Sequence, residues 1–506
     1  MNFLHFLYHQ FDRLVTKSYF PEIKDKKAEQ AKLGILRIVL GCIVSVRVYE
    51  ILYFAPLLGV AAKSMVLGYI ELGFCVLFTL GLFTPIITLL LFLTYISFID
   101  RQMQTITLGS AILMQALLVL LFVNHGRYYS IDALILKQNH FLSKMLGKVY
   151  NILGEADEKQ MRIAYFLGFI SYAIVSLGAL SYHVQDKNWL HGYTTQVLLT
   201  NTFLCKYPFF FRNLEQIAPE FFQLFSIVSL LGQSFFQFFM LPLMFTRWGK
   251  NFVWLWGWNF FLVSFLIIQL SYLPHIEIII WIMLFHRFSA KDKFFPKLFA
   301  VNPNPIPINP QKSRVGKVAV AMYLCVILLY IPLNFPYLAN LSETILGSSY
   351  GRIASVIYKF GFDMPIVFNH TDLAMGDRWT VIYRLNHQQK ELVPLTGLLG
   401  ERLNYQNFDV LNFKNHNSDL LYFRTTLQYR RGLIGKDIKQ VHQDTNSEIY
   451  QKLYDMMYID KKYTQSAGKV KYLYEIYENH ASDAEYKDLS VKYKPILVYQ
   501  DSLIID

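Results

Sequence analysis

The run Ile163-Ala164-Tyr165-Phe166-Leu167-Gly168-Phe169-Ile170-Ser171-Tyr172-Ala173-Ile174-Val175-Ser176-Leu177-Gly178-Ala179-Leu180-Ser181-Tyr182-His183-Val184 decides the fold of this chain. It contains no Asp, Glu, Lys or Arg, and His183 is its only histidine. About 20 apolar residues in helical form match the hydrocarbon thickness of a bilayer, and a helix satisfies its own backbone in lipid. We therefore expect residues 163–184 to cross a membrane.

Further apolar runs precede and follow this one. Together they predict an all-α polytopic membrane bundle of about nine transmembrane helices, with a C-terminal extramembrane α+β domain. The eighth expected helix is short for a span. The expected spans lie at 33–56, 65–82, 85–100, 106–124, 163–184, 221–246, 252–271, 275–287 and 316–335.

The composition agrees with a membrane protein. Of the 506 residues, 54% are hydrophobic and 17% are charged, and the apolar residues lie in long blocks. The formal net charge of +12 fits basic loops on the inner side of a membrane, so we expect lipid as a partner and no nucleic acid. The four cysteines lie in or beside apolar runs without metal-ligand spacing, which indicates neither a zinc site nor a disulfide framework.

Basic residues predict the side of the membrane on which each loop lies. With the N-terminus in the cytoplasm, the inner loops hold most lysines and arginines, and an odd number of spans places the C-terminal domain outside. We expect an inner-side segment over 1–32, the bundle over 33–336 and a periplasmic or lumenal domain over 337–506. Abundant lysine and asparagine without disulfides favour a bacterial inner membrane.

The segment 337–506 is polar and aromatic. Its runs Arg378–Arg384 and Leu421–Tyr429 are typical of strands. The segment shows no nucleotide-binding loop, no catalytic triad pattern and no cluster of metal ligands. We therefore expect a structural or binding module, with a possible peptide or protein partner at its surface.

Ionisable residues within the expected spans have two interpretations. Arg37, Arg47 and Glu50 fall in the first span and Glu71 in the second. Such residues face the bundle interior and find partners there. Arg47 and Glu50 share a helix face and favour a buried ion pair that fixes helix register, whereas a polar pocket for an anionic or quinone-like ligand is the functional alternative.

The stretch after the quoted run concentrates polar groups. His183 is followed by Lys187, Trp189 and His191 on the outer side. A histidine, or a lysine whose pKa is lowered by burial, can act as a base there. An interfacial belt, with Trp189 in the headgroup region and Lys187 in water, explains the same residues without catalysis.

Three short motifs resemble one family in the same order. They are Leu33-Gly34-Ile35-Leu36-Arg37-Ile38-Val39-Leu40-Gly41, Asn124-His125-Gly126-Arg127-Tyr128-Tyr129-Ser130-Ile131-Asp132 and Asp186-Lys187-Asn188-Trp189-Leu190-His191-Gly192-Tyr193. They are similar to motifs of the horizontally transferred transmembrane domain family, which includes the vitamin K-dependent gamma-carboxylases. The similarity covers roughly residues 30–290.

The resemblance implies a helical bundle that, in active carboxylases, deprotonates reduced vitamin K with a lysine. It then epoxidises the quinone with oxygen and carboxylates glutamates of a secreted peptide. In this sequence the family's lysine falls near His183 or Val184, and two family histidines fall near Thr107 and Asn259. These changes predict a divergent member without standard carboxylase chemistry.

We therefore expect a carboxylase-like membrane protein that engages a peptide, lipid or quinone-like ligand at its outer face. One alternative is an active carboxylase or epoxidase that uses O2, CO2 and reduced vitamin K or a menaquinone-like quinone. Another is a non-catalytic subunit of a membrane assembly. The candidate site residues are His183 and Lys187 as catalytic bases, with Arg37, Trp189, His191 and Asn259 as ligand-binding residues and no metal.

Overall fold

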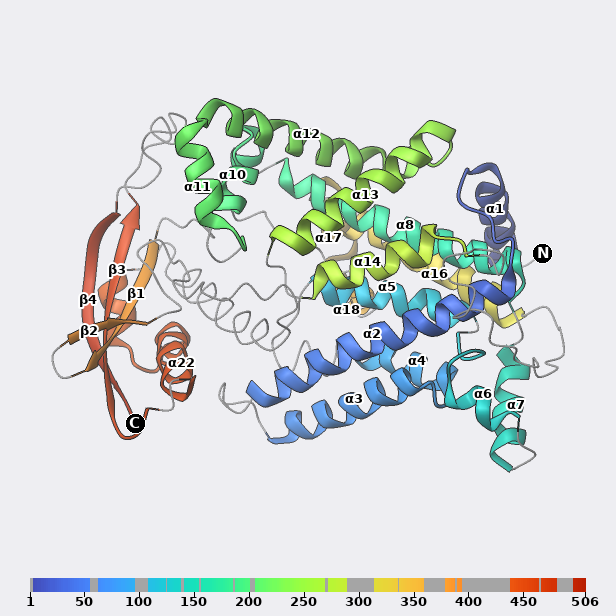
Figure 1. Cartoon of the computed structure of the whole chain (residues 1–506), viewed down its shortest axis with the longest axis horizontal. Coiled ribbons are helices and arrows are strands. Elements are labelled where there is room, and N and C mark those ends of the chain that lie inside the picture. Colours follow the sequence, from blue (N-terminus) through green and yellow to red (C-terminus); the bar gives the residue numbers. More distant parts are fainter. Residues whose placement is uncertain are drawn as a thin grey trace.

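The computed structural model describes residues 3–54, 62–95, 108–123, 125–137, 141–153, 156–184, 187–200, 205–268, 272–288, 314–334, 336–358, 378–386, 389–393, 437–463, 466–479 and 495–506. Most of these residues are helical (Figure 1). The first helices are α1 (Phe3–Lys17), α2 (Lys26–Phe54), α3 (Ala62–Leu80), α4 (Thr84–Tyr95), α5 (Leu108–Phe122), α6 (Ile131–Ile135), α7 (Phe141–Leu153), α8 (Glu158–His183), α9 (Lys187–Leu190) and α10 (Thr194–Thr200). Then come α11 (Pro208–Ile217), α12 (Pro219–Leu243), α13 (Arg247–Ile267), α14 (Leu273–Phe285), α16 (Arg314–Asn334), α17 (Pro336–Leu346), the 3-10 turn η3 (Gly347–Ser349) and α18 (Tyr350–Tyr358).

The apolar run 163–184 lies in α8 except for its last residue, Val184, and α8 is the central helix of the bundle. It packs against α5, α12, α14 and α16. In its most apolar 18-residue window, 94% of the residues are buried inside the protein. Side chains such as Phe166 and Phe169 are fully buried between neighbouring helices. The apolar run therefore supplies protein core as well as the length needed to cross a bilayer.

Among the described residues, three helices are long and apolar enough to cross a membrane: Ala62–Leu80, Glu158–Ser181 and Pro219–Leu243. In the windows of α3 and α12 only 22% and 28% of residues are buried. Their outward faces carry exposed Val66, Ile70, Phe221, Leu224 and Leu231. Apolar faces of this extent indicate association with a membrane.

Four shorter apolar helices also lie among the described residues. They span Thr84–Tyr95, Gly109–Phe122, Leu273–Phe285 and Ala319–Ile331. The first expected span lies in α2, which carries Arg37, Arg47 and Glu50 within one apolar stretch. The expected count of nine spans and their orientation remain predictions.

Arg47 finds partners on other helices. Its Nη1 donates to the Tyr95 hydroxyl and, at 3.1 Å, to the Ser110 hydroxyl, and its guanidinium lies 3.9 Å from the Tyr272 ring centroid. Glu71 accepts a hydrogen bond from Thr94 at 2.9 Å. The side chain of Glu50, the expected partner of Arg47, lies outside the described residues.

A four-stranded antiparallel sheet lies near the C-terminus, with strand order β2-β1-β3-β4. Its strands are β1 (Arg378–Asn386), β2 (Gln389–Leu392), β3 (Val470–Asn479) and β4 (Pro495–Ile505), and α21 (Ile438–Gln443) and α22 (Glu448–Tyr463) accompany them (Figure 1). Arg384 of β1 pairs with Asp460 of α22 at 3.0 Å. The expected strand at Arg378–Arg384 is confirmed, whereas Leu421–Tyr429 lies outside the described residues. Helices α17 and α18, which follow α16 in the chain, contact it.

Candidate functional site

A buried polar network lies where the α3–α4 turn meets the segment after α5. Gly81 makes this turn with φ +68°, a conformation that favours glycine. Asp132, in α6, is fully buried and accepts hydrogen bonds from the backbone N–H groups of Phe83 and Thr84, both at 2.7 Å. The Thr84 hydroxyl donates to the same carboxylate at 2.6 Å. These charge-assisted hydrogen bonds fix the two segments against each other.

Arg37 joins α2 to this network. Its side chain is fully buried, and its guanidinium donates to the carbonyl oxygens of His125, at 3.1 Å, and Tyr129. The positive charge also interacts favourably with Asp132. A buried charge requires such compensation, because it loses the hydration that water provides. The structure thus gives Arg37, expected to bind a ligand, partners within the protein itself.

His125 is held as a neutral imidazole beside this network. Its Nδ1 faces the carbonyl oxygens of Leu120 and Val123 at 3.0 and 3.3 Å. Carbonyl oxygens only accept, so Nδ1 carries the proton, and Nε2 lies 3.1 Å from the Thr88 hydroxyl, which itself donates to the Thr84 carbonyl oxygen at 2.7 Å. Burial, and then the charge of Arg37, lower the pKa of His125 from 6.5 to about 3.

This lowered pKa predicts a loss of stability in acid. The unfolded chain takes up a proton at His125 near pH 6.5 and the folded chain only near pH 3, so stability is complete above pH 6.5 and falls as the pH drops. Between pH 7.5 and 5 the wild-type protein should lose about 2 kcal/mol more than His125→Asn, at ~1.4 kcal/mol per pH unit. Denaturant titrations in detergent micelles at both pH values measure this difference.

The control for that experiment is His5→Asn, because His5 is exposed on α1. This variant should show the same pH dependence as the wild-type protein. Equal slopes for the wild type and His125→Asn would contradict the neutral, buried state of His125.

An apolar cavity of about 450 Å³ opens beside His125. This volume lies within the ~300–1,000 Å³ range of small-molecule sites, whose walls are mostly apolar with a few polar groups. The Tyr150 hydroxyl, at one edge of the cavity, donates to Asp132 at 2.9 Å. Apolar lining comes from α4, α5 and α16, including Leu89, Phe92, Leu121, Phe122, Met322 and Val326. Polar lining comes from Thr84, His125, Tyr150, Gln160 and Lys317.

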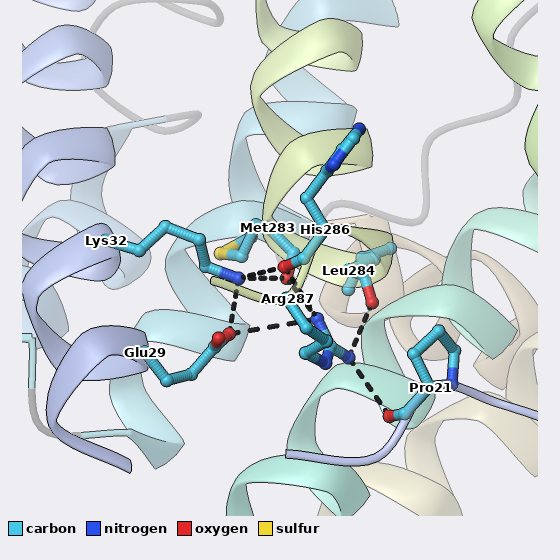
Figure 2. A network of polar contacts seen from close by, with 7 residues as sticks. All are labelled: Pro21, Glu29, Lys32, Met283, Leu284, His286 and Arg287. Atoms are coloured by element: carbon cyan, nitrogen blue, oxygen red, sulfur yellow. Dashed lines mark hydrogen bonds and ion pairs between the residues drawn. The ribbon is translucent and has the colours of Figure 1, made fainter. Parts of the chain in front are cut away.

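A second buried network ties α2 to the end of α14 (Figure 2). Lys32 donates to the carbonyl oxygens of Met283 and His286 at 3.1 and 2.8 Å, and it pairs with Glu29. Arg287 lies 3.8 Å from the same Glu29 carboxylate. Lys32 and Arg287 thus satisfy carbonyl groups that a helix C-terminus leaves without intrahelical partners. The arrangement explains helix docking without invoking a ligand.

His183 and Trp189 lie together at the other end of α8. Their rings stack with centroids 4.2 Å apart and an interplanar angle of 6°. Both side chains are buried, and the Trp189 indole N–H donates to the Ser234 hydroxyl of α12 at 3.1 Å. The structure therefore joins two of the expected site residues in a packed pair between α8, α9 and α12.

The remaining expected site residues do not join this pair. Ile163 lines the cavity beside His125, and His183 lies 20 residues further along α8, or about 30 Å at 1.5 Å per residue. Arg37, bound to His125, is therefore far from His183. Asn259 is exposed on α13, and His191 is exposed after α9. The side chain of Lys187 lies outside the described residues.

Asp132, His125, Thr84 and Tyr150 were not among the site residues expected from the sequence. His125 and Asp132 lie in the motif at 124–132, which was used only for the family resemblance. Nothing in the sequence indicated that Thr84 and Tyr150 reach the same carboxylate, because both contacts depend on tertiary packing.

No protein-family model, no curated protein and no solved structure matches this chain. The resemblance to the carboxylase-like family therefore rests on the short motifs alone.

Proposed function

We propose that this is an integral membrane protein that binds a hydrophobic ligand with a small polar head, a lipid or a quinone-like molecule. The observation that carries the proposal is the apolar cavity of about 450 Å³, whose few polar lining residues include Thr84, His125 and Tyr150. Leu89, Phe92 and Met322, which line the cavity, offer apolar contact to an extended tail. The lining offers aromatic surface for a ring and few polar atoms to orient it.

The residues present fit a quinone in chemical type. Phe92, Phe122 and Tyr323 offer aromatic contact for its ring, and the lining residue His125 is a neutral imidazole, so it places no charge beside the ligand. A bound quinone would supply two-electron redox chemistry, and this chain's own residues would bind and orient its ring and exclude water. Lys317 lines the cavity within a segment that the basic-loop pattern assigns to the inner side, so this proposed site differs from the expected outer-face site.

Substitution of Ala319 tests this proposal, because Ala319 lines the cavity. Ala319→Trp should fill much of the volume and weaken binding of a short-chain prenylated naphthoquinone or of phospholipid at least tenfold, since a rigid wall leaves no room for the ligand. Calorimetric titration of the purified protein in micelles measures the affinity for the quinone, and native mass spectrometry measures retained phospholipid.

The matched control is Leu329→Trp, which places the same side chain on the exposed face of α16. Its affinities for both probes should equal those of the wild type. Unchanged affinity in Ala319→Trp, with the wild-type unfolding midpoint, would exclude this cavity as the ligand site.

The second candidate is a peptide-modifying carboxylase or epoxidase at the opposite end of α8. The stacked His183–Trp189 pair and the resemblance support it. This enzyme should incorporate labelled carbon dioxide into a glutamate-containing peptide when reduced quinone is present. A protein that only binds a ligand should not. Stable co-purification of another protein without such incorporation would instead favour a subunit of a membrane assembly.

A further inference from the structure

Helix α7 is docked to the bundle along one face. Leu146 and Tyr150 are each 1% exposed and pack with Leu136, and Phe83 and Ile135 adjoin them. The hydroxyl of Tyr150 donates to Asp132, the carboxylate that holds the α3–α4 turn. The position of α7 relative to the bundle is therefore fixed by core packing and by a hydrogen bond.

A second face of α7 is apolar and exposed. The side chains of Phe141, Leu142 and Met145 are 79%, 46% and 38% exposed. Positions 141 and 145 are one helical turn apart, so these side chains form one continuous stripe. Single exposed apolar residues are common on protein surfaces, but a stripe on a helix already docked by its other face indicates an apolar environment.

The third face of α7 is basic. Lys144 and Lys148 are exposed and one turn apart, and Lys137 precedes the helix. No acidic residue occurs between Asp132 and Glu155 in the sequence. Lysines beside an exposed apolar stripe are typical of helices that lie in the plane of a membrane interface, where they attract anionic lipids.

The position of α7 along the bundle agrees with a location at the membrane interface. Its anchor Asp132 binds the turn that joins the end of α3 to the start of α4. The chain leaves α7 and enters α8 at Glu158. Because α3 and α8 are both candidate spanning helices, their ends mark the boundary of the hydrocarbon region, and α7 lies at that boundary.

We propose that α7 is an interfacial helix that binds anionic phospholipid. Phe141, Leu142 and Met145 insert between acyl chains, and Lys144 and Lys148 pair with lipid phosphates. This inference needs no ligand in the cavity, so it stands or falls independently of the proposed function. A basic, apolar stripe could also contact another protein, but the placement of the stripe at the ends of α3 and α8 favours lipid.

Photocrosslinking locates the environment of each face. The full chain carrying benzoylphenylalanine at Met145 is reconstituted in nanodiscs of equal parts phosphatidylglycerol and phosphatidylcholine. The matched position is Asn151, which is exposed on the basic side of the same helix. Lipid adducts are expected at position 145 and at least several-fold fewer at position 151. Equal lipid adducts at both positions would overturn the proposal. Adducts that are mainly with protein, when the position-145 variant is crosslinked in native membranes, would also overturn it.

Removal of the charges of Lys144 and Lys148 tests whether α7 prefers anionic phospholipid. The double variant Lys144→Gln, Lys148→Gln should bind phosphatidylglycerol about 30-fold more weakly, because each interfacial lysine contributes about fivefold. Added salt should weaken wild-type binding in the same direction. Native mass spectrometry with titrated phosphatidylglycerol measures the affinity, and Lys439→Gln, exposed on α21, serves as the control. Undiminished binding in the double variant, with the wild-type unfolding midpoint, would also overturn the proposal.

Discussion

Asp132→Asn is expected to lower the free energy of unfolding by about 3–5 kcal/mol. The carboxylate accepts hydrogen bonds from two backbone N–H groups, the Thr84 hydroxyl and the Tyr150 hydroxyl. An asparagine turns one acceptor into a donor, so at least one of the N–H groups loses its partner. It also removes the negative charge that balances buried Arg37. Denaturant titration in detergent micelles measures the loss.

Glu158→Gln provides the comparison for a carboxylate at the surface. Glu158 is exposed in the first turn of α8, so its removal should cost at most about 1 kcal/mol. If Asp132→Asn cost no more than Glu158→Gln, the network around Asp132 would not hold the α3–α4 turn in place.

Gly81→Ala is expected to destabilise the protein by about 3 kcal/mol. The positive φ of Gly81 costs an alanine about 1 kcal/mol or more. In addition, a Cβ atom would lie 2.5 Å from the Ser130 Cβ and 2.6 Å from Arg37 Nη1, and such overpacking adds about 1–3 kcal/mol. The unfolding free energy of the variant in micelles checks the total.

Two other glycines separate the backbone effect from the clash. Gly347 has φ +52°, and no described atom lies within 4 Å of a Cβ placed there, so Gly347→Ala should show only the backbone cost of about 1 kcal/mol. Gly73 is helical and equally open, so Gly73→Ala should be neutral or stabilising. A cost at Gly81 no larger than that at Gly347 would mean that the turn moves to accommodate the side chain.

The helical part of the fold was largely predictable from local sequence. The run 163–184 lies almost entirely in α8, because a long uncharged stretch has few structural alternatives. Strand β1 was also predicted, because the alternation from Arg378 to Arg384 is local. Its partner β3 was not, since Arg378 pairs with Glu478 across a large separation in sequence.

The candidate site was harder to predict, because its contacts join distant segments. Arg37 was expected to bind a ligand, and the sequence does not show that the carbonyls of His125 and Tyr129 receive its hydrogen bonds. Asn259 was selected from the resemblance, yet it is exposed on α13. A uniformly apolar helix carries little periodic information about which face meets protein and which meets lipid.

The contacts of Arg37 also bear on the order in which the protein can assemble. Its partners are carbonyl groups of His125 and Tyr129 and the charge of Asp132, all of which are synthesised after α3, α4 and α5. Helix α2 therefore cannot complete its native polar contacts when it first leaves the ribosome. The N-terminal half reaches its native packing only when the segment 125–132 contacts Arg37 of α2, which lies nearly a hundred residues earlier in the chain. These helices therefore reach their final packing as a group.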